Sequence, residues 1–370
     1  MRQAAGTTLL AVGLLIAGPA DRLTAQDSQF GIRGLGTPGR WEGVRARSTG
    51  GAWAPFDAFS ALTEAPLADV RRLSAGVTTG TSWRSLELGG TNTALRASRF
   101  PALVIAGPLS RRLVVAGGFA TYLDKSFGVV TRDTVDLRGQ SQGVTDEITS
   151  DGAVADLRLA AAVRVRPWLA VGVALHTLTG STRVTAVRRF DDSTNYRTSF
   201  ARDEVAYGGR GASVSGLLDV TQDLRLAGWV RSDSKLTADV GGRTTATTEL
   251  PLAFGGGVQW RAGTEAAVAG AVAWRLWGGS GPNSHDTFSW SLGGEVGSLA
   301  SPLRIGVRGG QLPFGPGVKA PTEFGVTAGL GKQFSGGRGR LDFGLERLER
   351  KGAGLRERVW TFVLALTVRP

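Results

Sequence analysis

The sequence predicts an all-β chain that folds as a transmembrane, antiparallel, up-and-down β-barrel of about 14 strands with an N-terminal plug segment. Three observations support this fold class. Successive stretches place large apolar residues at every second position, and the links between these stretches alternate between short and long. Beyond the N-terminus, no stretch of the 370 residues is apolar enough for a spanning helix. A barrel in lipid needs such strands, because its backbone groups all pair within one closed sheet.

The last stretch, residues 356–369, shows the alternation clearly. Trp360 and Phe362 share one parity, whereas Thr361 and Ala365 share the other. This is a period-2 strand with a large apolar face and a face of small or polar residues, as expected for a wall between lipid and a wet lumen. Two earlier stretches repeat the design, residues 302–309 and 323–334.

We expect the barrel to occupy residues 74–370, because strand-like stretches follow one another through this region. They lie near residues 74–88, 96–107, 111–130, 150–166, 168–188, 203–220, 223–240, 249–262, 265–277, 287–298, 302–313, 323–334, 338–350 and 355–369.

The links between these stretches supply an independent check. Short links lie at 107–108, 166–167, 221–223, 262–264, 299–301 and 335–337, and longer or more polar ones at 131–149, 189–203, 241–249, 278–286 and 314–322. Outer-membrane barrels have short periplasmic turns and long external loops, so both ends of the barrel should lie at the short-turn side.

Four aromatic residues lie where an interfacial girdle is expected, near the external ends of two adjacent strands. They are Trp274, Trp277, Phe288 and Trp290. The alternative is the ordinary preference of aromatic residues for strands.

Residues 1–25 have the features of a secretory signal peptide. Arg2 gives a positive start, an apolar run spans residues 9–16, and a cleavage site precedes Gln26. The alternative is a membrane anchor, but the run is shorter than the ~20 residues that a spanning helix needs. Export without a helical anchor predicts the bacterial outer membrane, with its lipids and the barrel assembly machinery as partners.

Residues 26–73 do not alternate, and we expect them to form a plug inside the barrel. Trp53 and Phe56 are among several apolar residues that a disordered periplasmic tail, the alternative, would lack. Residues 45–52 (RARSTGGA) and 57–62 (DAFSAL) resemble the N-terminal region of the FadL-like outer-membrane transport proteins, in which this region is a plug. The family's N-P-A is replaced here by residues 63–65 (TEA).

The resemblance implies a channel for hydrophobic or amphipathic small molecules, including anionic amphipathic ones. A structural or assembly barrel without transport is the alternative, and a barrel enzyme is the third hypothesis. An apolar pocket between plug and wall would favour transport, and a tight set of lumen ion pairs would favour the structural barrel.

Composition excludes several other functions. The formal net charge is +12, but the arginines are spread through alternating strands, so we expect no nucleic-acid partner. Cysteine is absent, which removes disulfides and thiol nucleophiles. With no P-loop, nucleophile elbow or HExxH motif, we expect no enzyme activity, no metal and no cofactor.

Four inward-facing residues are candidates for contact with a ligand in the lumen: Arg158, His176, Arg304 and Arg308. The arginines either pair with inward carboxylates such as Asp342 and Glu346, or attract an anionic solute. His176 is expected to be a polar lining residue, and catalysis would require an acidic or serine partner beside it. The other histidine, His285, belongs to an exposed loop.

Overall fold

The computed structural model describes residues 28–370 except 33, 89–90, 138, 299 and 316. The predicted signal peptide therefore lies outside the described residues. No helix in the described part is long and apolar enough to cross a membrane.

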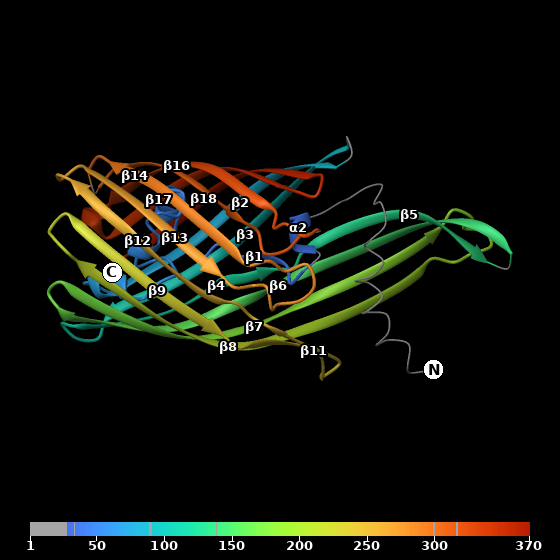
Figure 1. Cartoon of the computed structure of the whole chain (residues 1–370), viewed down its shortest axis with the longest axis horizontal. Helices are drawn as coiled ribbons and strands as arrows, with labels where there is room; N and C mark the ends of the chain where they lie inside the picture. Colours follow the sequence, from blue (N-terminus) through green and yellow to red (C-terminus); the bar gives the residue numbers. More distant parts are fainter. Residues whose placement is uncertain (1–27, 33, 89–90, 138, 299, 316) are drawn as a thin grey trace.

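The chain forms one closed antiparallel sheet (Figure 1). Its strands are β2 Ser74–Leu88, β3 Thr91–Pro108, β4 Leu113–Asp124, β5 Phe127–Leu137, β6 Gln140–Arg166, β7 Leu169–Phe190, β8 Ser199–Asp219, β9 Leu224–Asp233, β10 Lys235–Val240, β11 Arg243–Glu249, β12 Leu252–Ala262, β13 Ala266–Arg275, β14 Thr287–Val296, β15 Leu303–Gln311, β16 Thr322–Phe334, β17 Gly339–Gly352 and β18 Leu355–Val368. A short 3-10 turn, η3 Ser335–Gly337, joins β16 to β17.

The barrel has fourteen spanning strands, as predicted. Three spanning strands are each interrupted and carry two labels. The first is β4 with β5, which both pair with β6. The second is β9 with β10, which both pair with β8. The third is β11 with β12, which pair with β10 and β9 respectively. The last strand, β18, closes the barrel on β2 in a continuous register from Leu355↔Leu88 to Val368↔Ala75.

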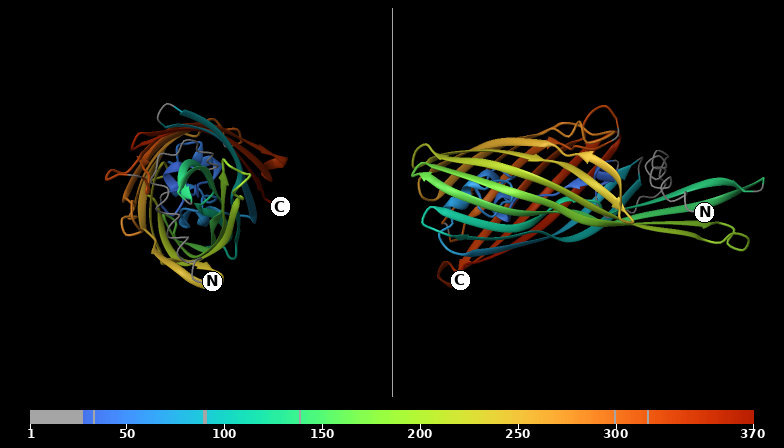
Figure 2. Two further views of the ribbon diagram at one scale, coloured as in Figure 1. Left: turned by 90° about the vertical axis from the view of Figure 1, so that its right-hand side faces the viewer. Right: turned by 90° about the horizontal axis from the view of Figure 1, so that it is seen from below.

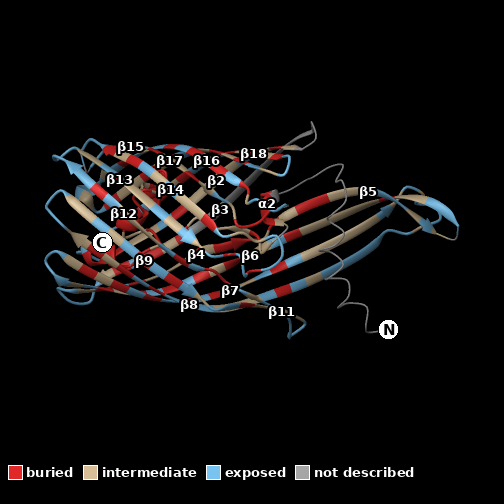
Figure 3. Ribbon diagram, viewed as in Figure 1, coloured by how far each residue is buried: buried red, intermediate tan, exposed pale blue. Residues whose placement is uncertain are grey.

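The alternation in sequence sets which side chains face outward. On β15, Leu303 and Ile305 are 59% and 68% exposed, whereas Arg304 between them is 4% exposed. Figure 3 shows buried and exposed positions alternating along the strands. The large apolar residues thus form the outer face, and Gly, Thr and Arg line the lumen.

The links differ in part between the two ends of the barrel. At one end, which we call the short-turn end, short turns join the strands, for example at residues 109–112 and 167–168, whereas the other end has both longer loops and two-residue turns, such as residues 353–354. At the other end, two predicted loops are corrected. Residues 131–149 belong largely to the β5–β6 hairpin, and residues 241–249 largely to β11. Because β-branched and polar residues alternate there, the strands continue past the barrel wall, as Figures 1 and 2 show for β5–β8.

The aromatic girdle is only partly as expected. Trp274 and Trp290 are each 39% exposed on the outer face. The ring of Trp274 stacks on Phe254 and lies tilted against Phe288. Trp277 is 2% exposed, and its ring packs edge-on against Phe314 at 5.3 Å. Its place in an interfacial girdle was therefore wrong, because the strand ends at Arg275 and the alternation of faces stops with it.

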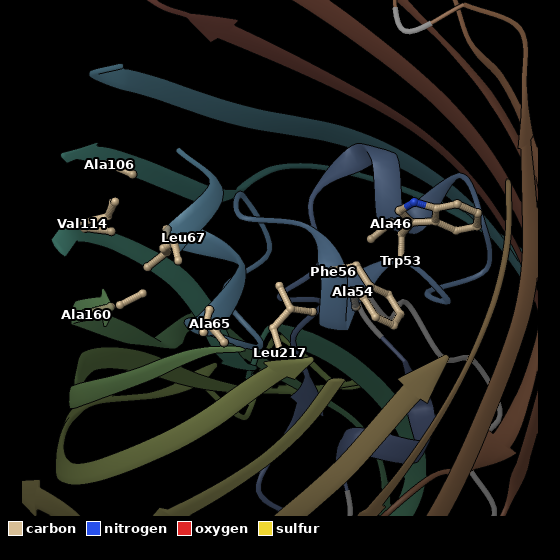
Figure 4. Close-up of a cluster of buried hydrophobic side chains, with 14 of the residues drawn as sticks. Ala46, Trp53, Ala54, Phe56, Ala65, Leu67, Ala106, Val114, Ala160 and Leu217 are labelled. Carbon is tan, nitrogen blue, oxygen red and sulfur yellow. The ribbon is translucent and has the colours of Figure 1, made fainter. Parts of the chain in front are cut away.

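Residues 28–73, here called the inner segment, lie within the ring of strands (Figure 2, left). The segment contains α2 Gln29–Ile32, β1 Thr37–Pro38, α3 Val44–Arg47, η1 Ala54–Phe56 and η2 Ala65–Asp69. Trp53 and Leu67 are fully buried, and Leu67 packs in one cluster with Val114 and Leu217 of the wall (Figure 4).

Glycines of the wall and of the segment permit this close packing. Gly50 has φ +72°, and a Cβ there would lie 2.4 Å from the carbonyl oxygen of Val307. A Cβ at Gly306 would lie 2.1 Å from the carbonyl carbon of Thr49. The segment and β15 therefore meet backbone to backbone, which no larger residue would allow.

Candidate functional site

The lumen arginines of β15 are paired with carboxylates of neighbouring strands. Arg304 Nε donates to Glu295 at 2.7 Å, and its Nη1 donates to Asp342 at 2.7 Å. Arg308 Nη2 donates to Glu323. Both residues thus face the lumen as predicted, with carboxylate partners, and Arg304 contacts the expected Asp342.

Glu346 has a different partner from the one expected. It accepts two hydrogen bonds from Arg47 of the inner segment, at 2.9 and 2.6 Å, and Arg40 lies 3.5 Å away. Arg45 makes a second bidentate pair, with Glu295 at 2.9 and 2.7 Å. The arginines of residues 45–52 therefore join the segment to the wall. Sequence reasoning quoted these arginines for the family resemblance but did not assign them partners.

The charges in the inner segment respond to this setting. Burial alone would raise the pKa of Glu42, but the positive charges of Arg40 and Arg308 outweigh it and lower that pKa to about 2. Burial raises the pKa of Asp57, and the nearby charge of Arg45 opposes that rise only in part. Glu42 is thus an ionised member of the lumen network, whereas Asp57 is protonated more readily than an ordinary aspartate.

His176 lies in a buried hydrogen-bond chain. Its Nδ1 is 3.0 Å from both carboxylate oxygens of Asp156, and its Nε2 is 2.8 Å from Ser213 Oγ. The acid and serine partners that a catalytic role would require are therefore both present, in the spacing of a hydrolase triad. Ser213 Oγ, however, donates to Glu64 of the inner segment at 2.8 Å and is buried, so a carboxylate of the protein occupies the position a substrate would need.

Arg158 also points to this region. Its Nη1 lies 3.7 Å from Glu64, and the residue is 5% exposed. Asp156, Ser213 and Glu64 were not predicted as site residues. Asp156 shares the inward parity of Arg158 on β6, which is the signal that could have found it.

The wall of the barrel is split beside the inner segment. Among the described residues, β3 pairs with β4 only between Ala102↔Ala120 and Pro108↔Val114. Further along, residues 91–99 of β3 pair with β2 alone, and the pairing with β2 is irregular between Thr78 and Gly80. Pro101 lies at this point, and proline has no N–H to donate to a neighbouring strand.

The inner segment occupies the edge of β4 that β3 leaves. In β1, Thr37 pairs with Asp124 and Pro38 with Leu123. Gly39 N donates to the carbonyl of Tyr122 at 2.9 Å, and Trp41 Nε1 donates to the carbonyl of Thr121 at 3.1 Å. The other edge of β4 is paired with β6 at the same residues, so β1 lies on the β3 side.

Cavities lie on either side of the segment. One of about 120 Å³ lies beside β1, which covers the split, and is lined by Thr37 to Arg40 of the segment together with residues of β2, β4, β17 and β18. A larger cavity of about 500 Å³ opens toward the short-turn end. Its lining combines apolar residues such as Phe59 and Val104 with arginines such as Arg72 and Arg340. The lumen therefore holds the tight ion pairs that were to favour the structural barrel, whereas the pocket between segment and wall is amphipathic and not the apolar pocket that was to favour transport.

Comparisons with known proteins give matches in structure only. No protein-family model and no curated protein sequence matches the chain. Among solved structures, a Pseudomonas aeruginosa FadL homologue has a TM-score of 0.63 at 12% identity, covering 90% of this chain and 99% of that one. The CymD monoaromatic hydrocarbon channel has a TM-score of 0.57 at 15% identity, covering 91% and 98%. The P. putida toluene transporter TodX has a TM-score of 0.56 at 12% identity, covering 92% and 99%. At these identities the likeness concerns the fold, and the chain has the fold of the FadL-like outer-membrane proteins.

Proposed function

We propose that this protein is a channel of the bacterial outer membrane for hydrophobic or amphipathic small molecules, in which the inner segment is the plug. The split between β3 and β4 carries the proposal. It lies in a wall whose outer face is apolar, a segment of the chain itself covers the exposed edge of β4, and a cavity lies beside that segment. A sealed structural barrel has no need of such a split.

The proposed path leads from the lipid-facing side of the split, past β1, to the larger cavity at the short-turn end. That cavity suits an amphipathic solute, because Phe59 and Val104 offer apolar contact while Arg72 and Arg340 offer positive charge. The short-turn end is the periplasmic end in this proposal, with membrane lipids and the barrel assembly machinery as the partners of the outer wall.

A cross-link across the split tests the path. Thr37 and Asp124 face each other across the β1–β4 pair, and the chain has no native cysteine, so Thr37→Cys/Asp124→Cys has a single possible intramolecular disulfide. Uptake of a hydrophobic fluorescent dye is measured in cells that carry the protein in the outer membrane. We expect uptake to stop on oxidation and to return on reduction.

The matched control places the same bond far from the split. Ala266 and Val296 face each other in the β13–β14 pair near the short-turn end. Ala266→Cys/Val296→Cys should leave uptake unchanged in both redox states. Uptake that is insensitive to the Thr37–Asp124 bond would contradict the path.

The structural barrel is the second candidate, and the ion pairs from Arg45 and Arg47 to the wall favour it. Conductance in a planar bilayer separates the two. A nearly silent full chain and a conducting chain without residues 27–73 would support a plugged channel. Two silent but strand-rich proteins would support the structural barrel.

A further inference from the structure

The hydrogen-bond chain at Glu64 fastens one end of the inner segment to the wall. Glu64 is fully buried, and Asp156, His176 and Ser213 are 1%, 3% and 7% exposed. They come from β6, β7 and β8, so one side chain of the segment is linked to three adjacent strands. Because water does not reach these groups, the hydrogens in the chain can be counted.

Ser215 is fully used and fixes one side of Glu64. Its Oγ accepts the backbone N–H groups of Glu64 and Ala65, at 2.9 and 2.8 Å. It donates its single hydrogen to Glu64 Oε2 at 2.9 Å. Ser215 therefore has no hydrogen to spare for any other contact.

Ser213 has one hydrogen for two close contacts, Glu64 Oε1 and His176 Nε2, each at 2.8 Å. If the hydroxyl donates to an ionised Glu64, then Nε2 of His176 must carry a hydrogen and donate to Oγ. Nδ1 must also carry one, since it faces the Asp156 carboxylate at 3.0 Å. The imidazole is then positively charged.

The reverse direction needs the same number of protons. If the hydroxyl donates to a neutral His176, then Glu64 must be protonated to donate to Oγ. With Glu64 ionised and His176 neutral, one contact in the chain has no hydrogen: either one of the two 2.8 Å contacts or, if Nε2 carries the ring hydrogen, the contact of Nδ1 with Asp156. We infer that the Glu64–Ser213–His176–Asp156 chain is a proton-binding site, and that its proton fastens the inner segment to β8.

The charges around the chain fix where the proton lies. On β6, Nη1 of Arg158 is 3.7 Å from Glu64. On β9, Arg231 donates to Asp156 at 2.6 Å and also pairs with Asp233. Tyr122 of β4 donates to Asp233 at 2.9 Å, so β4 also contributes a titratable group near the site. Each of the two carboxylates therefore has an arginine beside it, and this geometry assigns the shared proton to His176.

The direction of the pH effect follows from the count. At low pH the site holds its proton and every contact is made. As the pH rises and the proton is lost, one contact of the chain is left without a hydrogen, and the attachment of η2 to β8 weakens to the contacts that Ser215 makes. Release of the segment is therefore favoured by alkaline conditions.

Glu64→Gln separates this inference from a merely structural role. The amide nitrogen of the glutamine can donate to Ser213, whose hydroxyl then donates to a neutral His176, and the amide oxygen still accepts from Ser215. Every contact is made without the extra proton. The variant should therefore keep the segment fastened and lose the pH dependence.

The experiment measures hydrogen exchange of residues 60–70 as protection factors between about pH 5 and pH 9, a range that spans histidine titration. Wild-type protection should fall at least tenfold with rising pH, and Glu64→Gln protection should stay constant. Thr327→Val is the control. It removes hydrogen bonds to Ser48 and Gly50 of the segment without touching a titratable group, so the pH dependence should persist.

A second readout, the protonation of the His176 ring nitrogens observed by NMR, does not depend on transport activity. The chain has two histidines, so His285→Gln leaves a single ¹⁵N-histidine signal in labelled protein in detergent micelles. We expect both ring nitrogens of His176 to be protonated in the fastened state, and only one in Glu64→Gln at the same pH. Ser213→Ala, which interrupts the chain, should likewise leave one. Identical His176 titrations and protection profiles in wild type and Glu64→Gln would overturn the inference, whether or not the protein conducts.

Discussion

The pair between Arg47 and Glu346 is the contact whose loss should loosen the inner segment most. The guanidinium makes two hydrogen bonds, at 2.9 and 2.6 Å, to a carboxylate that is fully buried. Removing one partner of a buried pair costs ~3–5 kcal/mol, because the other charge is left uncompensated. Arg40 remains 3.5 Å from Glu346, so we expect Arg47→Met to destabilise the attachment of the segment by about 3 kcal/mol, near the lower end of that range.

That free energy corresponds to roughly a hundredfold change in the equilibrium between the fastened and released segment. Hydrogen exchange of residues 44–52 in refolded protein measures it. Arg347→Met is the matched control, on the same strand as Glu346. Arg347 lies over the outer-face ring of Trp360, and this contact contributes ~1 kcal/mol or less to stability.

A double variant tests the physical reason for the effect. In Arg47→Met/Glu346→Met, no buried charge is left without a partner, and Arg40 keeps its pair with Glu42 at 3.0 Å. Protection should return to within about 1 kcal/mol of wild type. Unchanged protection in the single variant, or a double variant as weak as the single one, would refute the reasoning.

Three further predictions concern packing and charge. Gly50→Ala should lower the free energy that holds the segment in place by ~1–3 kcal/mol in the same exchange assay, because the new Cβ would meet the Val307 carbonyl. Gly241→Ala is the control: Gly241 also has a positive φ, +59°, but a Cβ there has open space, so only local backbone strain should change. The pKa of Glu42 is lowered from 4.5 to about 2, so its contribution to stability is present above about pH 4.5 and is lost as the pH falls toward 2; Glu42→Gln should flatten that part of an acid-unfolding curve. Trp277→Ala should lower the free energy of unfolding by ~3–5 kcal/mol in denaturant, because it leaves a cavity beside Phe314. Trp274→Ala, on the half-exposed outer face, should cost less. Equal losses would contradict the assignment of the two residues to different faces.

Local patterns were sufficient for the barrel itself. The parity of Trp360 and Phe362 on one side and Thr361 on the other is a property of the extended backbone, so it predicts inward and outward faces without knowledge of any neighbour. The parity of β6 likewise puts Asp156 on the lumen face with Arg158. The two-residue turn at residues 167–168 joins β6 to β7, but an irregularity between Arg164 and Arg166 shifts their register and brings Arg158 opposite His176. Strand number, faces and short turns are therefore encoded in the sequence directly.

The contacts across the lumen were decided by tertiary structure. Glu346 was expected to pair with an arginine of the wall and instead holds Arg47, which is 299 residues away in the chain. Ser213 on β8 reaches His176 on the adjacent β7, and the register of these two strands follows a longer connection that no local rule determines. The split between β3 and β4 has a visible signal in Pro101, but the strand that covers it, β1, is two residues long and comes from the inner segment. Periodicity gives the face on which a side chain lies, whereas its partner depends on how the closed barrel places segments that are remote in sequence.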